Sequence, residues 1–198
     1  IKERDLFLVR SHDMKRDLIS IGFPSEKIVV HHLGIPVDKF EFRIREPDNE
    51  FRILTVARLI EKKGIPYAIK AIAKLKRNGY NNVSLRIVGD GPMKPTLIDL
   101  IRKLSLEKDV KILGKLSNYS DVIKEMLNAH IFVLPSVTAS DGDKEGTPTV
   151  LIEAQATGLP CISTYHAGIP EVVIDGKTGF LVKERDVDAL AQKIACIM

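Results

Sequence analysis

The feature that most constrains the fold is a regular alternation of short apolar stretches and helical stretches that begins at Phe51. The apolar stretches lack a polar–apolar alternation, as is typical of strands covered on both faces. We predict strands at residues 51–57, 83–88, 110–113, 131–134, 161–164 and 179–182. Between and after them we predict helices at 66–78, 95–104, 121–129 and 149–157, a short one near Pro170 and a last one from Asp186. This order predicts an α/β fold with a doubly wound parallel sheet.

The residues before Phe51 follow a different pattern. We predict a strand at 5–11, a helix at 13–21, a strand at 28–31 and a loop at 32–40. Residues 42–50 have no periodicity and contain a proline, so they form the expected linker. The chain does not begin with Met, and its first residues, 1–5, do not resemble a signal peptide. We therefore expect it to be part of a longer chain.

Composition excludes several classes of protein. Of the 198 residues, 44% are hydrophobic and 28% are charged, as in ordinary globular domains. No apolar run approaches the ~18 residues of a membrane span. Cys161 and Cys196 lack metal-ligand spacing and are expected to be reduced thiols of a cytoplasmic protein. The net charge of +4 fits a phosphate-bearing ligand, an anionic membrane surface or a solvated surface equally well. The lysines are spread along the chain, so no nucleic-acid partner is predicted.

A loop that runs directly into a helix, residues 145–153, is the first candidate site. We expect Thr147 to cap this helix and Pro148 to occupy its first position, where a missing N–H does no harm. Gly146 would let the backbone come close to a ligand. The free N–H groups of a first helical turn form a pocket for an anion.

Two carboxylates flank this expected anion pocket. Glu153 lies one turn beyond Thr149 on the same helix face, and Glu145 precedes the helix. Carboxylates on both sides of an anion pocket suit a nucleotide-sugar, which has phosphates at its centre and hydroxyl groups at its ends. The alternative interpretation is a buried helix with a capped start.

The doubly wound sheet predicts which other residues face this pocket. Ligands bind beyond the carboxyl ends of the strands where the winding reverses, here between the first and fourth strands. Arg58 and Lys63 follow the first strand and suit two adjacent phosphates, although both could be ordinary exposed charges. Gly89 and Gly91 follow the second strand, where glycines permit backbone contact with a ligand but also serve a turn.

Four segments at 58–64, 89–92, 145–153 and 166–171 resemble the donor site of family-4 retaining glycosyltransferases. The resemblance implies a GT-B fold, in which two Rossmann-like domains face each other. Residues 46–198 resemble the donor-binding domain, and residues 1–45 resemble the end of the N-terminal domain with the linker. The stretch 140–149 is similar to enzymes of bacterial and archaeal surface-polysaccharide assembly.

The resemblance also implies roles for single residues. Arg58 and Lys63 would bind the diphosphate and stabilise the leaving nucleotide. Glu145 would accept hydrogen bonds from the transferred sugar, and Glu153 from the ribose. The base would lie near Leu116, and His166 would line the sugar end. Two groups of residues would complete the donor site: Gly89 and Gly91 after the second strand, and Gly146, Thr147, Thr149 and Val150 at the start of the helix.

As a whole, the resemblance implies transfer of a hexose from a UDP- or GDP-sugar, with retention, in polysaccharide or glycolipid biosynthesis. No cofactor or metal is expected. The acceptor, a sugar or a lipid-linked sugar, would bind mainly to an N-terminal domain outside this sequence. The reaction would occur in the cytoplasm, either in solution or with the enzyme in contact with the inner face of the membrane. A dinucleotide-dependent oxidoreductase, a non-catalytic nucleotide-sugar-binding module and a nucleotide-sugar epimerase are the alternatives.

Overall fold

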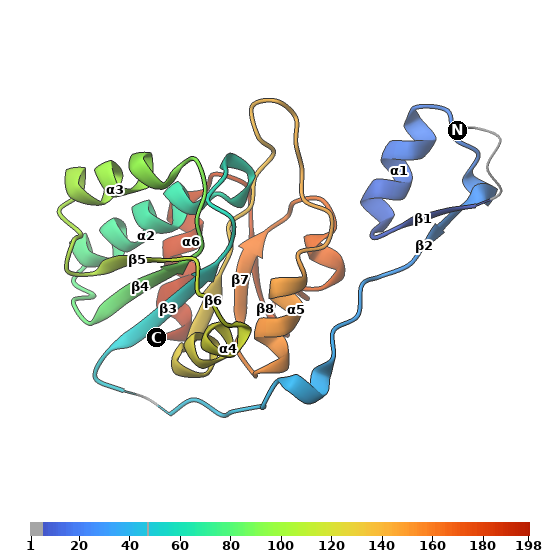
Figure 1. The fold of residues 1–198 in the computed structure, drawn as a ribbon. Helices are drawn as coiled ribbons and strands as arrows, with labels where there is room; N and C mark the ends of the chain where they lie inside the picture. Colours follow the sequence, from blue (N-terminus) through green and yellow to red (C-terminus); the bar gives the residue numbers. More distant parts are fainter. Residues whose placement is uncertain (1–5, 47) are drawn as a thin grey trace.

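A computed structural model describes residues 6–46 and 48–198 and shows a six-stranded parallel sheet (Figure 1). Its strands are β3 (Phe51–Val56), β4 (Val83–Val88), β5 (Val110–Gly114), β6 (Ile131–Val133), β7 (Cys161–Thr164) and β8 (Gly179–Val182). Their spatial order is β5-β4-β3-β6-β7-β8, and every neighbouring pair is parallel. The winding reverses between β3 and β6. The predicted strands, their parallel pairing and the switch point between the first and fourth strands are therefore confirmed.

Helices cover both faces of this sheet. On one face α2 (Ile65–Arg77), α3 (Lys94–Lys103) and α6 (Val187–Ile197) enclose one apolar core, and on the other α4 (Tyr119–Asn128) and α5 (Thr149–Ala156) enclose a second. Successive strand residues alternate between the two cores: Ile53 belongs to the first and Leu54 to the second. Apolar side chains are needed on both faces, which explains why the strand sequences do not alternate. Among the described helices, none is long and apolar enough to cross a membrane.

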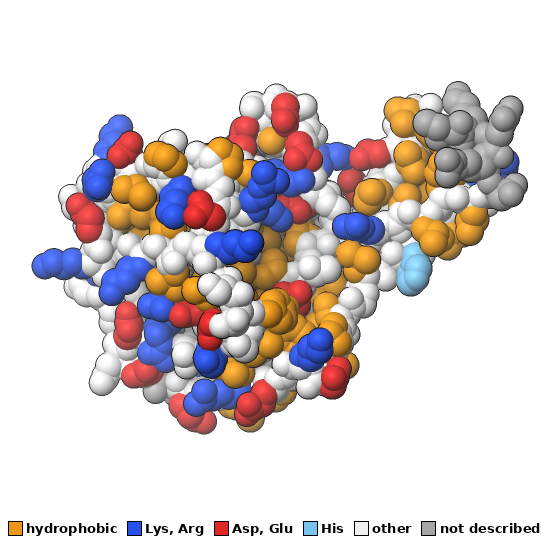
Figure 2. Space-filling view, in the orientation of Figure 1, with side chains coloured by type: hydrophobic (Ala, Val, Ile, Leu, Met, Phe, Trp, Pro, Cys, Tyr) orange, Lys and Arg blue, Asp and Glu red, His pale blue; other side chains and the backbone are white. Residues whose placement is uncertain are grey.

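The N-terminal segment forms a separate small unit. β1 (Phe7–Val9) and β2 (Ile28–Val30) pair in parallel, and α1 (His12–Ser20) connects them. The predicted elements are confirmed: both strands are shorter than predicted, and the helix begins and ends one residue earlier, although Asp5 of the predicted first strand lies outside the described residues. Hydrophobic side chains lie at the surface of this unit (Figure 2), including Leu8, which is 63% exposed.

The linker passes along the amino ends of the strands (Figure 1). One arginine, Arg45, anchors it. Nε of Arg45 donates to the carbonyl of Ala129 at 3.2 Å, and Nη2 donates to that of Met126 at 3.1 Å. Nη1 of the same guanidinium donates to the carbonyl of Thr157. Met126 and Ala129 lie at the end of α4 and Thr157 caps the end of α5, so one cation satisfies carbonyls of two helix termini. Pro47 of the predicted linker lies outside the described residues.

Candidate functional site

The segment after β3 holds the long loop between β6 and α5 in place. Glu61 accepts hydrogen bonds from the N–H of Ser140 at 3.0 Å and from its hydroxyl at 2.7 Å. The next residue, Lys62, pairs with Asp143 at 2.9 Å and donates to the carbonyl of Lys144 at 3.1 Å. These bonds join the carboxyl ends of β3 and β6, where the sheet reverses its winding, as the fold argument predicts.

The centre of the site is a buried ion pair between Lys63 and Glu145. Nζ of Lys63 lies 2.6 Å from Oε1 of Glu145, and their side chains are only 15% and 7% exposed. Within the described chain, Oε1 has no partner in hydrogen-bonding geometry, although the ammonium group provides charge close by. A buried carboxylate oxygen of this kind can accept a hydrogen bond from a ligand hydroxyl.

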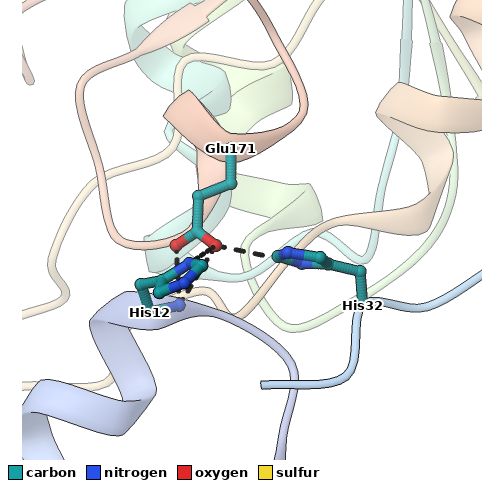
Figure 3. A group of neighbouring side chains, drawn as sticks. All are labelled: His12, His32 and Glu171. Carbon is teal, nitrogen blue, oxygen red and sulfur yellow. Dashed lines mark hydrogen bonds and ion pairs between the residues drawn. The ribbon is translucent and has the colours of Figure 1, made fainter.

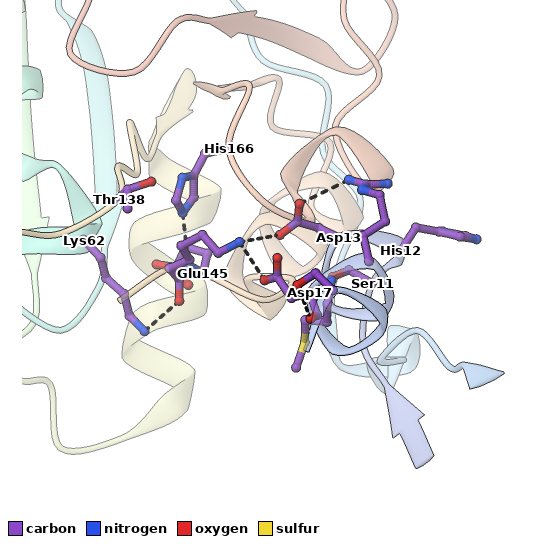
Figure 4. Close-up of polar contacts among 12 residues, drawn as sticks. Ser11, His12, Asp13, Asp17, Lys62, Thr138, Glu145 and His166 are labelled. Carbon is purple, nitrogen blue, oxygen red and sulfur yellow. Dashed lines mark hydrogen bonds and ion pairs between the residues drawn. The ribbon is translucent and has the colours of Figure 1, made fainter. Parts of the chain in front are cut away.

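His166 fixes the backbone of Glu145 (Figure 4). The N–H of Glu145 donates to Nε2 of His166 at 3.0 Å, so the ring proton is on Nδ1, which donates to Oε1 of Glu184 at 2.6 Å. The His166 side chain is buried, and its role is to hold the backbone of Glu145 in position. The resemblance implied a place at the sugar end of the pocket, but the structure gives its two nitrogens protein partners.

Glu184, which sequence reasoning did not single out, connects this network to β8. Burial raises the pKa of its carboxyl group, but hydrogen bonds from the N–H of Thr138 and from His166 lower it, and the net pKa lies below the ordinary value. The Thr138 contact measures 2.9 Å. No sequence motif indicated Glu184. It follows β8, and the pairing of β8 with β7 brings it next to His166, which follows β7.

The expected cap of α5 is wrong. Pro148 occupies the N-cap position and the helix begins at Thr149, while Thr147 lies outside the helix. The Thr147 hydroxyl donates to the carbonyl of Arg10 at 3.1 Å instead, because the N-terminal unit packs against this loop. Among the described residues no side chain caps α5, so the N–H groups of Thr149 and Val150 in its first turn are available to an anion.

The N-terminal unit covers part of the loop that precedes α5 (Figure 4). Nζ of Lys144 lies 3.2 Å from the carboxylate of Asp13 and 2.6 Å from that of Asp17, both on α1. A Cβ atom added to Gly146 would lie 3.5 Å from the sulfur of Met14. The approach to Gly146 is therefore shared between α1 and any ligand.

The remaining predicted residues after β3, β4 and β5 lie at the same edge of the sheet. Arg58 is exposed, and its side chain makes no hydrogen bond or ion pair with another described residue. A Cβ at Gly89 would lie 1.9 Å from the carbonyl oxygen of Ala57, and one at Gly91 2.6 Å from that of Leu59. The close packing of the loop after β4 against the loop after β3 therefore explains both glycines without a ligand. Leu116, after β5, packs partly buried against the second core.

Glu153 meets a partner that the sequence did not predict. This partner is Tyr119, the first residue of α4. Burial is the larger cause and the nearby carboxylate of Glu153 the smaller cause of a pKa of the Tyr119 phenol group above its ordinary value. The ring packs edge-on against Phe40 at 6.2 Å between centroids. The predicted start of this helix, residue 121, left Tyr119 in a loop, which is why the pair was missed.

One group of side chains in the described chain could hold a metal ion: His12, His32 and Glu171 (Figure 3). The resemblance implied no metal, and no spacing in the sequence indicated this group, because only the tertiary structure brings His12 and Glu171 to His32.

Two cavities lie at the opposite edge of the sheet. One of about 360 Å³ opens between the amino ends of β3 and β4, and one of about 440 Å³ lies between the linker and the C-terminal residues. In the first, Arg86 forms a bidentate ion pair with Glu125, with contacts of 2.6 and 2.7 Å. We assign the site to the carboxyl edge, because ligands of doubly wound sheets bind beyond the carboxyl ends of the strands, where the winding reverses.

The chain matches one family model and resembles bacterial proteins along nearly its whole length. The model described as glycosyl transferases group 1 matches residues 36–198. WcaL of Escherichia coli strain K12, named for colanic acid biosynthesis, is 43% identical over 193 residues, which cover 96% of this chain and 47% of WcaL. AmsK of Erwinia amylovora, an amylovoran biosynthesis glycosyltransferase, is 40% identical over 190 residues, which cover 96% and 46%. The chain thus spans about half the length of these relatives.

Solved structures share the fold. A glycosyltransferase of Rickettsia africae superposes with a TM-score of 0.82 at 25% identity, covering 98% of this chain and 53% of that protein. Anabaena HepE, solved in complex with UDP-glucose, superposes with a TM-score of 0.83 at 24% identity, covering 97% and 53%.

Proposed function

The chain belongs to the family of group 1 glycosyl transferases, and from this membership we propose that it binds a nucleotide-diphospho-sugar whose sugar is transferred to an acceptor with retention. In this proposal the chain is the donor-binding part of a GT-B enzyme of polysaccharide or glycolipid biosynthesis. The cytoplasm is the proposed compartment, because both cysteines are unpaired thiols, which are typical of reducing environments.

The observation that carries the proposal is the buried pair of Lys63 and Glu145 beside the uncapped start of α5. An ammonium group and free N–H groups attract phosphate oxygens, whereas a carboxylate repels them and accepts hydrogen bonds from hydroxyl groups. A ligand that satisfies both must carry phosphate and hydroxyl groups next to each other. The diphosphate–sugar junction of a nucleotide-sugar has this chemistry.

The site residues then divide into two groups. Lys63, Arg58 and the first turn of α5 bind the diphosphate and stabilise the charge on the departing nucleotide, as preorganised donors do in other transfer reactions. Glu145 accepts hydrogen bonds from the sugar and Glu153 from the ribose. Nucleotide contacts come from the backbone, at Gly89, Gly91, Leu116, Gly146, Thr147 and Val150.

A calorimetric titration with UDP, GDP, ADP and their sugars tests this proposal. UDP-glucose is tried first, because HepE, a protein of the same fold, was solved with it. We expect one nucleoside diphosphate to bind best and its sugar to add affinity that Glu145→Gln removes. The control is Glu107→Gln, because Glu107 is exposed at the surface. Glu184→Gln is unsuitable, because Glu184 contacts His166 of the site. Absence of binding to every diphosphate would reject the donor site.

We further propose that the 198-residue chain alone binds the donor and transfers no sugar. Transfer requires an acceptor hydroxyl held against the sugar in a closed cleft, and such positioning contributes ~7–11 kcal/mol to lowering a barrier. The relatives contain about twice the length of this chain, and we assign the acceptor to their additional part. A radiolabelled-donor assay with lipid-linked and free-sugar acceptors should show donor hydrolysis at most. Transfer by this chain would place the acceptor site within it.

A further inference from the structure

Three side chains from distant parts of the sequence meet beside the 166–171 loop (Figure 3). His12 is the first residue of α1, His32 follows β2, and Glu171 ends the short helix η4 (Ile169–Glu171). One potential ligand atom from each lies within 4.8 Å of the other two. We propose that these residues form a binding site for a divalent transition-metal ion such as Zn²⁺.

The distances are close to those of a tetrahedral zinc site. Nδ1 of His12 lies 2.9 Å from Oε2 of Glu171, and Nδ1 of His32 lies 3.8 Å from the same oxygen. Zinc bonds of about 2.0–2.1 Å in tetrahedral geometry place ligand atoms roughly 3.3 Å apart. One distance must therefore lengthen and the other shorten by about half an ångström. The two imidazole side chains are 63% and 48% exposed, so both rings are free to make this adjustment.

The carboxylate is already oriented for this role. The backbone N–H of His12 donates to both carboxylate oxygens of Glu171, to Oε1 at 2.9 Å and to Oε2 at 3.1 Å, and this bifurcated bond fixes the group with Oε2 beside the two rings. Metal-binding carboxylates are commonly held by such outer hydrogen bonds.

Metal binding replaces two existing hydrogen bonds. Nδ1 of His12 now bonds to Glu171, and Nδ1 of His32 lies 3.2 Å from the carbonyl of Arg10. With an ion bound, Nδ1 of each ring becomes a ligand and the ring proton moves to Nε2. Two imidazoles and one carboxylate leave a fourth position for water, and this donor set favours Zn²⁺ over Mg²⁺ or Ca²⁺.

The site joins the N-terminal unit to the six-stranded sheet. His12 and His32 belong to the first, and Glu171 belongs to the loop whose His166 bonds to the backbone of Glu145. A bound ion would add a link between α1 and this loop.

Calorimetric titration of the chain with zinc chloride at pH 7.5 tests the site, in a Cys196→Ser background because Cys196 is an exposed thiol that could bind zinc by itself. We expect one Zn²⁺ per chain and no binding of Mg²⁺. His12→Ala, His32→Ala and Glu171→Gln should each weaken binding about tenfold or more. His31→Ala is the matched control, because His31 is exposed next to His32 and is not part of the cluster.

A second measurement separates loss of a ligand from loss of structure. Zn²⁺ should shift the Nδ1 resonances of His12 and His32 in imidazole ¹⁵N spectra and leave those of His31 unchanged. His32→Ala is the variant to rely on where Glu171→Gln loosens α1, since the polar contacts of His32 among the described residues are those with Arg10 and with the cluster. Equal zinc affinity of His32→Ala and the parent, or unshifted Nδ1 resonances at one equivalent, would overturn the proposal.

Discussion

Nζ of Lys63 lies 2.6 Å from Oε1 of Glu145, with both side chains largely withdrawn from solvent. Lys63 ends the short helix after β3, and Glu145 lies in the loop before α5. The pair therefore joins the two strands between which the sheet reverses its winding. It contributes to stability and, in the proposed function, to donor binding, so the two properties should be coupled.

Breaking this pair should destabilise the chain. We expect Lys63→Met and Glu145→Gln each to lower the free energy of unfolding by about 3 kcal/mol, because each leaves a buried charge without its partner. The double variant should lose less than the sum of the two. Urea denaturation measures all three. The control is Lys124→Met, whose side chain is 71% exposed in an ion pair with Asp121 on the surface of α4 and whose loss should change stability by at most about 1 kcal/mol.

Arg58 and Lys63 should contribute to diphosphate affinity. Each change to alanine is expected to weaken binding of the preferred nucleoside diphosphate by about 1.5–3 kcal/mol, the range for charge-assisted hydrogen bonds. Nucleoside binding should change little, since it lacks the phosphates. Lys70→Ala, an exposed residue on α2, serves as the control in the same calorimetric titration. Parent-like diphosphate affinity in both site variants would contradict the assigned placement.

Arg45 should be the main anchor of the linker. Burial, and to a smaller extent the charge of Arg43, lower the pKa of Arg45. Its guanidinium group donates hydrogen bonds to carbonyl groups at the ends of both α4 and α5. We expect Arg45→Ala to reduce stability by about 2–3 kcal/mol, in line with charged hydrogen bonds to carbonyl groups. Arg45→Lys should restore little, because an ammonium group lacks the planar fork that reaches several acceptors. Arg43→Ala, at an exposed neighbouring position, should be close to neutral in thermal denaturation.

Stability should fall in acid partly through Glu184. Its folded-state pKa lies below the ordinary value of 4.5. A lowered carboxyl pKa contributes stability above the unfolded pKa, and this contribution disappears as the pH falls through the folded pKa. Glu184→Gln should therefore be less stable than the parent at neutral pH and lose less stability on acidification below about pH 4.5. A parallel pH profile of the two proteins would contradict this.

Donor binding should not require a divalent metal. Lys63, Arg58 and the start of α5 supply the positive charge that a metal ion supplies elsewhere. Nucleotide titrations in EDTA and then in magnesium or manganese should give the same affinity. A gain above tenfold with either ion would contradict the prediction. This test is independent of the proposed zinc site, because His12 and His32 are absent from the donor site.

The sequence by itself determined the architecture from Phe51 onward. Apolar strands such as 131–134, separated by helices, are typical of a parallel sheet covered on both faces, and the direction of winding then placed Arg58, Lys63 and the loop before α5 at one edge. These conclusions follow from local periodicity and from connection rules, both of which can be read along a chain.

Tertiary structure alone decided which side chains meet. The Lys63–Glu145 pair, the support of Glu145 by His166 and the meeting of His12 with Glu171 join residues far apart in sequence. Thr147 shows the same limit, since the capping preference of a threonine was overridden by the N-terminal unit packed against it. Such contacts depend on distances between elements, and no local propensity encodes those distances.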